Sequence, residues 1–319
     1  MSYWVAKALI QGMISKLPLN VSRDYFFHKF MRKSVRLNEE TFSLKITECR
    51  RHLESYFSLI ASKEKRSFSV FELGTGWFPI LPVAFYLCGA FKIFTIDRTD
   101  LLTIGRVKEV LARFADYAER DELVKILPWA EGYRASRLQE MLKDAETLSV
   151  IELLKELNIH FIVCDAKDTG LAPSSIDFFV SNVTLEYIPE NILIGIFKEF
   201  RRLASPGALM SHLIITSDHY ADVDHSITPF NFLKYPTWLW KIFNNSWHYQ
   251  SRLRPSDYYR IHCDAGFNII EKHDDHGSVS DLKKIRVSKD FNHYSKDDLL
   301  IIRTRIVSAF GGDGTMNCA

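Results

Sequence analysis

The chain has 319 residues, of which 47% are hydrophobic and 25% charged, a balance that excludes an intrinsically disordered protein. Its 41 Lys and Arg residues nearly balance its 39 Asp and Glu residues. The net charge of +2 therefore gives no reason to expect a nucleic acid partner. The five cysteines are scattered, with no Cys-x-x-Cys spacing typical of a zinc site or a disulfide framework, so we expect a cytoplasmic protein.

The N-terminal region, residues 1–62, is predicted to form a helical cap. Lys7 and Lys16 interrupt its first apolar run, so neither a signal peptide nor a membrane span is expected there. Apolar residues recur in this run at helical spacing, namely Trp4, Val5, Ala8, Leu9, Met13 and Ile14. We expect this helix to dock on the core, and peripheral contact with a membrane surface is the alternative.

Residues 63–310 alternate between strand and helix patterns and are predicted to form one domain. The expected strands cover residues 67–73, 91–96, 160–164, 176–181, 208–216, 267–272 and 299–307. The expected helices cover residues 81–88, 104–117, 137–157 and 191–203. Insertions are expected at about 118–158 and, as a lid after the fifth strand, at 217–257, with a flexible tail at 311–319. Because consecutive parallel strands need crossover helices, the predicted fold is a Rossmann-like, seven-stranded, mostly parallel sheet with helices on both faces.

The strongest local signal lies where the first strand turns into a helix. Gly74 and Gly76 allow positive φ and a close approach of the backbone to a ligand. Asp97 ends the second strand at about the offset at which an acidic side chain binds ribose hydroxyls in nucleotide-binding sheets. Asp165 follows the third strand and Asn182 the fourth, so all five residues are predicted at the carboxyl edge of the sheet, where open α/β sheets bind ligands.

With these residues in place, the sequence resembles the class I S-adenosylmethionine-dependent methyltransferase family over residues 68–307. The resemblance implies S-adenosylmethionine as the cofactor. It also implies that Glu72 is the acid of the first motif, that Gly74 and Gly76, with Thr75 between them, flank the methionine moiety, and that Asp97 binds the ribose. Asp165, followed by Ala166, would contact the adenine. The stretch from Asn182 to Tyr187 would border the methyl donor. The chain departs from the family pattern at Phe78, where many members have a third glycine.

Two other functions remain open at this point. A nicotinamide-dependent oxidoreductase would also use glycines after the first strand and an acid after the second, although Phe78 disfavours it. A non-catalytic nucleotide-binding module with a protein partner would keep the same fold.

The substrate side is predicted from the segment after the fifth strand. It is rich in aromatic residues that either cover a second ligand or pack together: Phe230, Phe232, Tyr235, Trp238, Trp240, Phe243, Trp247 and Tyr249. His219 is the preferred general base, with Asp218 and His225 in reserve. The structural alternative is that Asp218 caps a helix while His219 packs in a polar network.

No metal site is expected, because no familiar ligand spacing is present. Arg252 and Arg254 are expected to form surface ion pairs or to hold a carboxylate or phosphate of the substrate. The function that we expect is methyl transfer to a hydroxyl or amine of a small-molecule acceptor.

Overall fold

The computed structural model describes residues 3–15, 36–60, 67–144, 148–245 and 249–311. Its central feature is a seven-stranded sheet of order β3-β2-β1-β4-β5-β7-β6. The strands are β1 (Phe68–Leu73), β2 (Ala90–Asp97), β3 (Ile159–Val163), β4 (Ile176–Asn182), β5 (Ala204–Ile215), β6 (Phe267–His276) and β7 (Ile301–Phe310). β7 pairs antiparallel with both β5 and β6, and the other pairs are parallel. The predicted fold class is confirmed.

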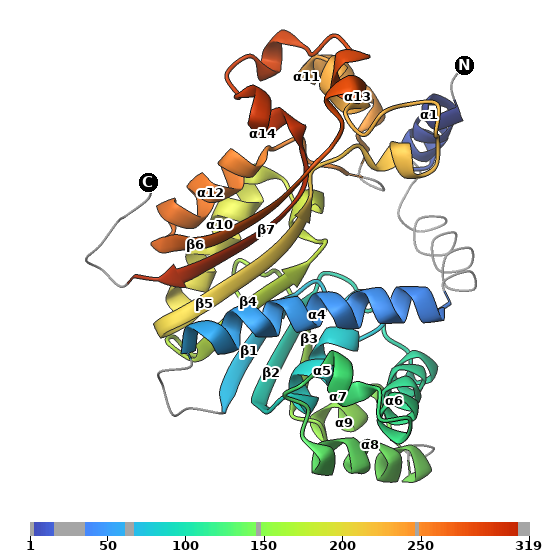
Figure 1. Cartoon of the computed structure of the whole chain (residues 1–319), viewed down its shortest axis with the longest axis vertical. Helices are drawn as coiled ribbons and strands as arrows, with labels where there is room; N and C mark the ends of the chain where they lie inside the picture. Colours follow the sequence, from blue (N-terminus) through green and yellow to red (C-terminus); the bar gives the residue numbers. More distant parts are fainter. Residues whose placement is uncertain (1–2, 16–35, 61–66, 145–147, 246–248, 312–319) are drawn as a thin grey trace.

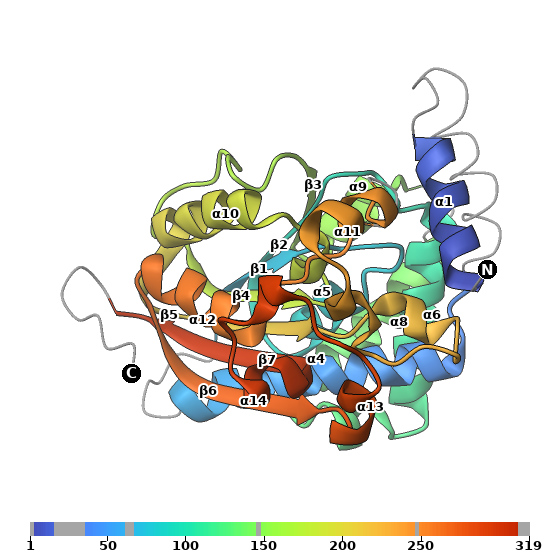
Figure 2. The ribbon, with the colours of Figure 1, turned by 90° about the horizontal axis from the view of Figure 1, so that it is seen from above.

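Helices cover both faces of this sheet (Figures 1 and 2). One face carries α4 (Glu39–Ile60), α5 (Ile80–Leu87), α6 (Ile104–Glu119), α7 (Leu123–Ile126), α8 (Gly132–Asp144) and α9 (Val150–Lys155). The other face carries α10 (Glu190–Leu203) and α12 (Pro255–Asp264). The single helix expected over residues 137–157 is two helices, and the second begins with a capping box in which Ser149 and Glu152 bond each other's backbone amides.

Alternation along the strands explains the two layers. Successive residues of one strand point to opposite faces, and both faces are covered, so the strands are apolar throughout rather than alternately polar. On β4, for example, Phe178 packs into the cluster under α4 and α5, whereas Phe179 packs into the cluster under α10. Both side chains are fully buried.

A third apolar cluster lies outside the two sheet layers, around the segment predicted as a lid. It joins α1 (Tyr3–Ser15), η3 (His219–Asp222), η4 (Asn231–Lys234), α11 (Thr237–Phe243), α13 (Val279–Lys283), η5 (Lys289–Phe291) and α14 (Lys296–Leu300). Phe230, Phe232 and Trp240 are buried in it, so most of the lid aromatics that the structure describes pack together. Trp247 lies outside the described residues.

The N-terminal helix docks on this third cluster. The Trp4 ring is buried, with its centroid 5.3 Å from that of Tyr220 and 5.1 Å from that of Phe243. The Trp4 backbone amide donates a hydrogen bond to Asp224 Oδ2 at 3.0 Å. The docking expected from the sequence is therefore present, although the surface that α1 contacts is the lid segment rather than the sheet.

Candidate active site

The turn after β1 holds the two glycines in left-handed backbone conformations. Gly74 has φ 91° and Gly76 φ 66°, values that side-chain-bearing residues rarely adopt. A Cβ atom placed on Gly74 would collide with the Thr184 side chain, so this glycine lets the segment after β4 pack against the turn. A Cβ atom on Gly76 would meet no atom within 4 Å. Gly76 therefore borders open space that a ligand can enter.

Asp97 closes this turn from the neighbouring strand. Its Oδ2 accepts a hydrogen bond from the Gly76 amide at 3.0 Å, and its Oδ1 accepts one from the Thr99 amide at 3.2 Å. Each carboxylate oxygen has a second lone pair. The half-buried side chain can thus accept further hydrogen bonds from ligand hydroxyls while the glycine turn keeps it oriented.

Glu72 lies beneath the turn and is buried. Its Oε2 accepts a hydrogen bond from Thr95, its register partner on β2, and the Thr95 hydroxyl is 2.5 Å from that of Thr75. Burial raises the pKa of Glu72 to about 7, although the Thr95 hydrogen bond opposes this. Thr95 was missed by the motif analysis, and only the strand register would have revealed it.

Asp165, Ala166 and Asn182 follow the next two strand ends. Asp165 is exposed, and its Oδ1 accepts the Lys167 amide at 3.0 Å while its Oδ2 is 3.3 Å from Lys167 Nζ. Ala166 is buried. Asn182 Oδ1 is buried, and the Asn182 side chain hydrogen-bonds the buried His52 of α4. Val183 after it has a positive φ of 55°, and a β-branched residue held in this strained conformation is typical of a functional turn.

These groups fit the cofactor that the sequence implies. The order of the strands reverses between β1 and β4, which is where open α/β sheets bind nucleotides. The open glycine follows β1, and the oriented carboxylate ends β2. Asp165, which follows β3, is exposed and pairs with Lys167 instead.

Phe78, at the position of the missing third glycine, turns toward the interior. It is buried in the cluster beneath α5 and α6, and Pro79 directly precedes α5. The Arg106 guanidinium lies over the Trp77 ring, 4.5 Å from its centroid. Phe78 therefore contributes to the core, and the turn keeps its two essential glycines without a third.

His219 and Tyr187 form a pair at the ends of β4 and β5. The Tyr187 hydroxyl is 2.9 Å from His219 Nδ1. Tyr187 is 41% exposed and His219 only 8%, so the phenol is the member of the pair that solvent and a substrate can reach. Burial lowers the pKa of His219 to about 4 and raises that of Tyr187, so both are neutral near pH 7.

The structure separates the two reserve residues from this pair. Asp218 is fully buried, and it accepts hydrogen bonds from the Tyr220 amide at 2.9 Å and from Asn231 Nδ2 at 3.0 Å. It thus caps η3, as the structural alternative proposed. His225 is exposed at the surface. Gln250, which the sequence analysis missed, orients the His219 loop by accepting the His219 amide at 3.1 Å and donating to the Ser217 carbonyl.

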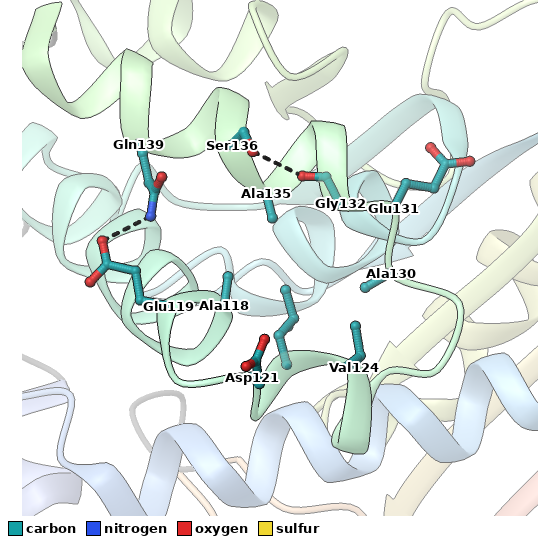
Figure 3. A pocket seen from close by; sticks show the side chains of 11 residues that line it. Ala118, Glu119, Asp121, Val124, Ala130, Glu131, Gly132, Ala135, Ser136 and Gln139 are labelled. Carbon is teal, nitrogen blue, oxygen red and sulfur yellow. Dashed lines mark hydrogen bonds between the residues drawn. The ribbon is translucent and has the colours of Figure 1, made fainter.

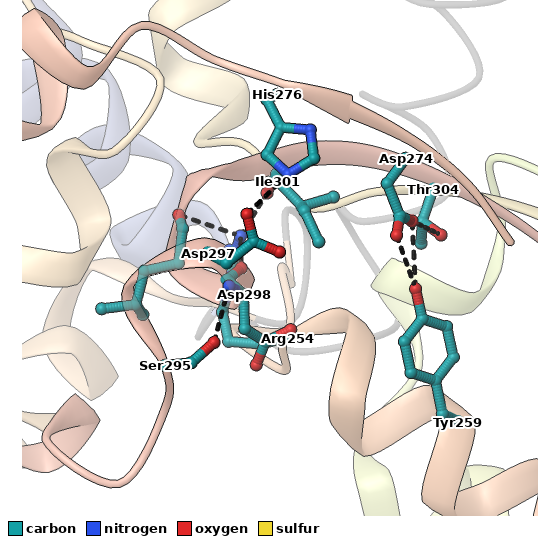
Figure 4. Close-up of polar contacts among 10 residues, drawn as sticks. Arg254, Tyr259, Asp274, His276, Ser295, Asp297, Asp298, Ile301 and Thr304 are labelled. Atoms are coloured by element: carbon teal, nitrogen blue, oxygen red, sulfur yellow. Dashed lines mark hydrogen bonds and ion pairs between the residues drawn. The ribbon is translucent and has the colours of Figure 1, made fainter. Parts of the chain in front are cut away.

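Arg252 and Arg254 hold the lid together, and the expectation of surface ion pairs or substrate contacts is wrong for Arg254. That side chain is fully buried and donates to the backbone carbonyl of Thr216 at 2.6 Å. It also donates to the carbonyl of Asp298 at 3.1 Å (Figure 4). Arg252 donates to the carbonyls of Phe232 and Tyr235. Both arginines thus supply hydrogen bonds to backbone carbonyls, which need donors when they are buried away from water.

A surface pocket of about 240 Å³ lies elsewhere, between the end of α6 and the start of α8 (Figure 3). Asp121 and Gly132 are among its lining residues. A crossover helix runs back from the carboxyl edge of the sheet toward the amino edge, so the end of α6 lies far from the strand ends. We therefore do not assign this pocket to the site.

Residues 127–211 match the family model for the methyltransferase domain. No curated protein matches the chain in sequence. The solved structures it resembles include magnesium protoporphyrin IX methyltransferase from Synechocystis PCC 6803, with a TM-score of 0.46 and 11% identity over 90% of this chain and 96% of that chain. A methyltransferase from Methanosarcina mazei has a TM-score of 0.43 and 13% identity over 79% of this chain and 96% of that chain. Phosphoethanolamine N-methyltransferase 2 from Haemonchus contortus has a TM-score of 0.43 and 13% identity over 92% of this chain and 61% of that chain.

The matched segment runs from the end of α7 into β5 and includes Asp165, Asn182 and Tyr187. It contains the ends of β3 and β4, whereas the glycine turn and Asp97 lie before it. Residues 127–211 are thus similar to a methyltransferase domain, and the geometry around Gly76 and Asp97 is compatible with a bound nucleotide.

Proposed function

We propose that this enzyme transfers a methyl group to a hydroxyl or amine of a small-molecule acceptor, and that the Tyr187–His219 pair takes up the proton of that nucleophile. The observation that supports this is the 2.9 Å contact between the phenol and the imidazole at the ends of β4 and β5. The cofactor residues in this proposal are Glu72, Gly74, Thr75, Gly76, Asp97, Asp165, Ala166 and Asn182. S-adenosylmethionine supplies an activated methyl group when bound, so the protein chiefly orients the acceptor and excludes water.

We base the proposed roles of the two side chains on their exposure. Tyr187 contacts the acceptor, and its oxygen accepts the proton of the nucleophile as its own proton passes to His219 Nδ1. His219 is therefore the final proton acceptor, although it does not contact the substrate. The low pKa of His219 keeps its imidazole neutral at pH 7, so Nδ1 keeps its lone pair. Because a group with a low pKa is a weak base, the proton moves to it only as a hydroxyl nucleophile gains the methyl group and becomes strongly acidic. The lid segment at 217–257 supports the pair from one side, since Gln250 orients His219.

Methyl transfer from labelled S-adenosylmethionine to a fractionated metabolite extract identifies the acceptor. With that acceptor, Tyr187→Phe and His219→Gln should each lower kcat by about 10²- to 10⁴-fold, because both remove the proton relay, with little change in affinity for S-adenosylhomocysteine. Tyr133→Phe, a change in an exposed tyrosine on α8, is the matched control and should leave kcat unchanged. Wild-type kcat in both relay variants would exclude the pair from catalysis. A labelled product methylated on carbon would instead refute the acceptor class.

A further inference from the structure

The turn that carries His219 is too short to be stable by itself. η3 has four residues, and a single 3-10 turn of this length depends on its surroundings. Asp218 caps its beginning, and the amides of Ala221 and Asp224 donate to the carbonyls of Asp218 and Tyr220. The position of His219 therefore depends on the contacts that the rest of this segment makes with other parts of the molecule.

Trp4 of α1 contacts both ends of this segment. The centroid of its ring lies 5.3 Å from that of the Tyr220 ring, and both side chains are buried. Its backbone amide donates a hydrogen bond to Asp224 Oδ2 at 3.0 Å. One residue of the N-terminal helix thus holds the beginning of η3 through packing and the residue that follows η3 and Val223 through a hydrogen bond.

The position of α1 depends on the same contacts. The first amides of a helix have no partner inside it, and α1 has no acidic residue in its first turn. The Asp224 carboxylate supplies an acceptor at the end of α1 where the helix dipole favours a negative charge. No helix in the described ranges is long and apolar enough to cross a membrane, and the apolar face of α1 with Trp4 and Ala8 is buried in the third cluster. α1 and η3 therefore stabilise each other.

Trp4 also connects η3 to the rest of the lid, beside which α1 lies in Figure 1. Its ring centroid is 5.7 Å from that of Tyr235 and 5.1 Å from that of Phe243, at the end of α11. The packed faces of α1 and α11 thus meet at this ring. Loss of the ring would leave a void among three aromatic side chains, and the short turn is the part that can move into it most easily.

His219 and Tyr220 are consecutive, but their side chains contact different partners. His219 Nδ1 is 2.9 Å from the Tyr187 hydroxyl, while the Tyr220 ring packs on Trp4. Gln250 accepts the backbone amide of His219 at 3.1 Å. The imidazole is therefore positioned from the sheet, from the lid and from the N-terminal helix. Because a misplacement of about 1 Å can greatly slow a reaction, a displaced turn would impair proton transfer between Tyr187 and His219.

We propose that α1 positions the proton relay, and that Trp4 is the positioning residue that holds η3 and, through it, His219. Trp4 is buried in the third cluster and acts through Tyr220 and Asp224. The functional part of this inference rests on the Tyr187–His219 pair of the proposed function. The contact of α1 with η3 can be measured without any methyl acceptor.

Hydrogen exchange of the full-length protein tests the contact itself. Trp4→Ala should make the amides of residues 219–224 exchange about tenfold faster or more, while those of β1 and β4 exchange as in the wild type. Tyr3→Ala, which truncates an exposed aromatic side chain on the same helix, is the matched control and should leave exchange unchanged. Trp4→Phe keeps a ring and should retain most of the protection.

Affinity for S-adenosylhomocysteine and the thermal unfolding midpoint show whether each variant is folded. Trp4→Leu, a smaller truncation, replaces Trp4→Ala in the same measurements if the alanine variant does not fold. Unchanged exchange of residues 219–224 in the folded variant would overturn the proposal.

Turnover with the methyl acceptor tests the functional part. Trp4→Ala should lower kcat about 10- to 100-fold with little change in affinity for S-adenosylhomocysteine, because the relay is displaced while the cofactor residues stay in place. In a protein that already carries His219→Gln, Trp4→Ala should lower kcat no further, since the relay is already absent. Equal losses in the two backgrounds would show that Trp4 acts independently of His219 and would overturn its positioning role. Wild-type kcat in His219→Gln would refute the relay and with it the functional part, whereas faster exchange in Trp4→Ala would still establish that α1 holds η3.

Discussion

At the scale of single residues, Asp97 has the most direct test. Its carboxylate is oriented by the amides of Gly76 and Thr99, so a ligand hydroxyl would meet an acceptor that is already in position. Asp97→Ala should weaken binding of S-adenosylhomocysteine by about 1–3 kcal/mol, measured by calorimetry, because charge-assisted hydrogen bonds are lost. Asp116→Ala, which removes an exposed aspartate on α6, should leave the affinity unchanged. An Asp97→Ala variant that binds as tightly as wild type would remove this carboxylate from the site.

The conformation of the two glycines could be predicted from sequence, because only glycine readily adopts the φ of Gly74 and Gly76. The binding roles of the acids after the strands stay predictions, since Asp165, for example, bonds the Lys167 amide. The partner of His219 could not be predicted in the same way. Tyr187 lies 32 residues earlier, and the pair exists only because β4 and β5 are neighbours. Asp218, beside His219 in sequence, turns away to cap η3.

At the scale of elements, Arg254 joins three segments that are distant in sequence. Its guanidinium donates to the Thr216 carbonyl after β5, to the carbonyls of Asp298 and Leu299 in α14, and to that of Ile301 at the start of β7. Arg254→Met should lower the free energy of unfolding by about 3–5 kcal/mol, because buried carbonyls lose their donor. Urea unfolding measures the loss. Arg260→Met, on the same helix, breaks a surface pair with Glu190 and should cost no more than about 1 kcal/mol. Similar losses in the two variants would contradict this role.

The strand positions were predicted to within a few residues at most ends, since continuous apolar runs between turn residues mark buried strands. The break between α8 and α9 was missed because apolar spacing continues through it. The lid was expected from its aromatic residues and from its position after the fifth strand. Its actual core includes α1, α13 and α14, which the sequence pattern could not assign to one cluster because they are far apart along the chain.

At the scale of the whole molecule, buried ionisable groups lower the stability of the fold toward both acid and alkaline pH. Burial raises the pKa of Glu72 to about 7, of Glu186 to about 8 and of Asp218 to about 6. In the unfolded chain these carboxyls ionise near pH 4. Between that pH and the folded pKa values, the folded state keeps protons that the unfolded state releases. Stability from these three groups therefore falls as pH rises from about 4 to about 8.

Buried histidines act in the opposite direction. The Nδ1 atoms of His52, His212 and His262 are each within 2.8 Å of a serine hydroxyl inside the two sheet layers. Burial lowers the pKa of His212 to about 3 and that of His219 to about 4, and it lowers those of His52 and His262 well below the usual value. The unfolded chain binds these protons below about pH 6.5, whereas the folded chain does not. Stability from the histidines is therefore lost as pH falls below that value.

The two opposing groups predict a stability maximum close to neutrality. Below about pH 6, the unfolded chain binds extra protons at the four histidines, and these outnumber the extra protons that the folded chain keeps at the three carboxyls. Stability therefore decreases as the pH falls further. Above about pH 7 the histidines are neutral in both states and no longer contribute. The folded chain still holds the Glu186 proton, which the unfolded chain has released, so stability decreases as the pH rises further. Urea unfolding from pH 5 to pH 9 should show this maximum between about pH 6 and pH 7.

Glu186→Gln isolates the alkaline side, because an amide cannot ionise in the buried position beside the Ile215 amide. Relative to wild type, the variant should gain about 4 kcal/mol between pH 5 and pH 9. A constant difference between the two proteins across this range would show that Glu186 is ionised in the folded enzyme and that a buried donor stabilises its charge.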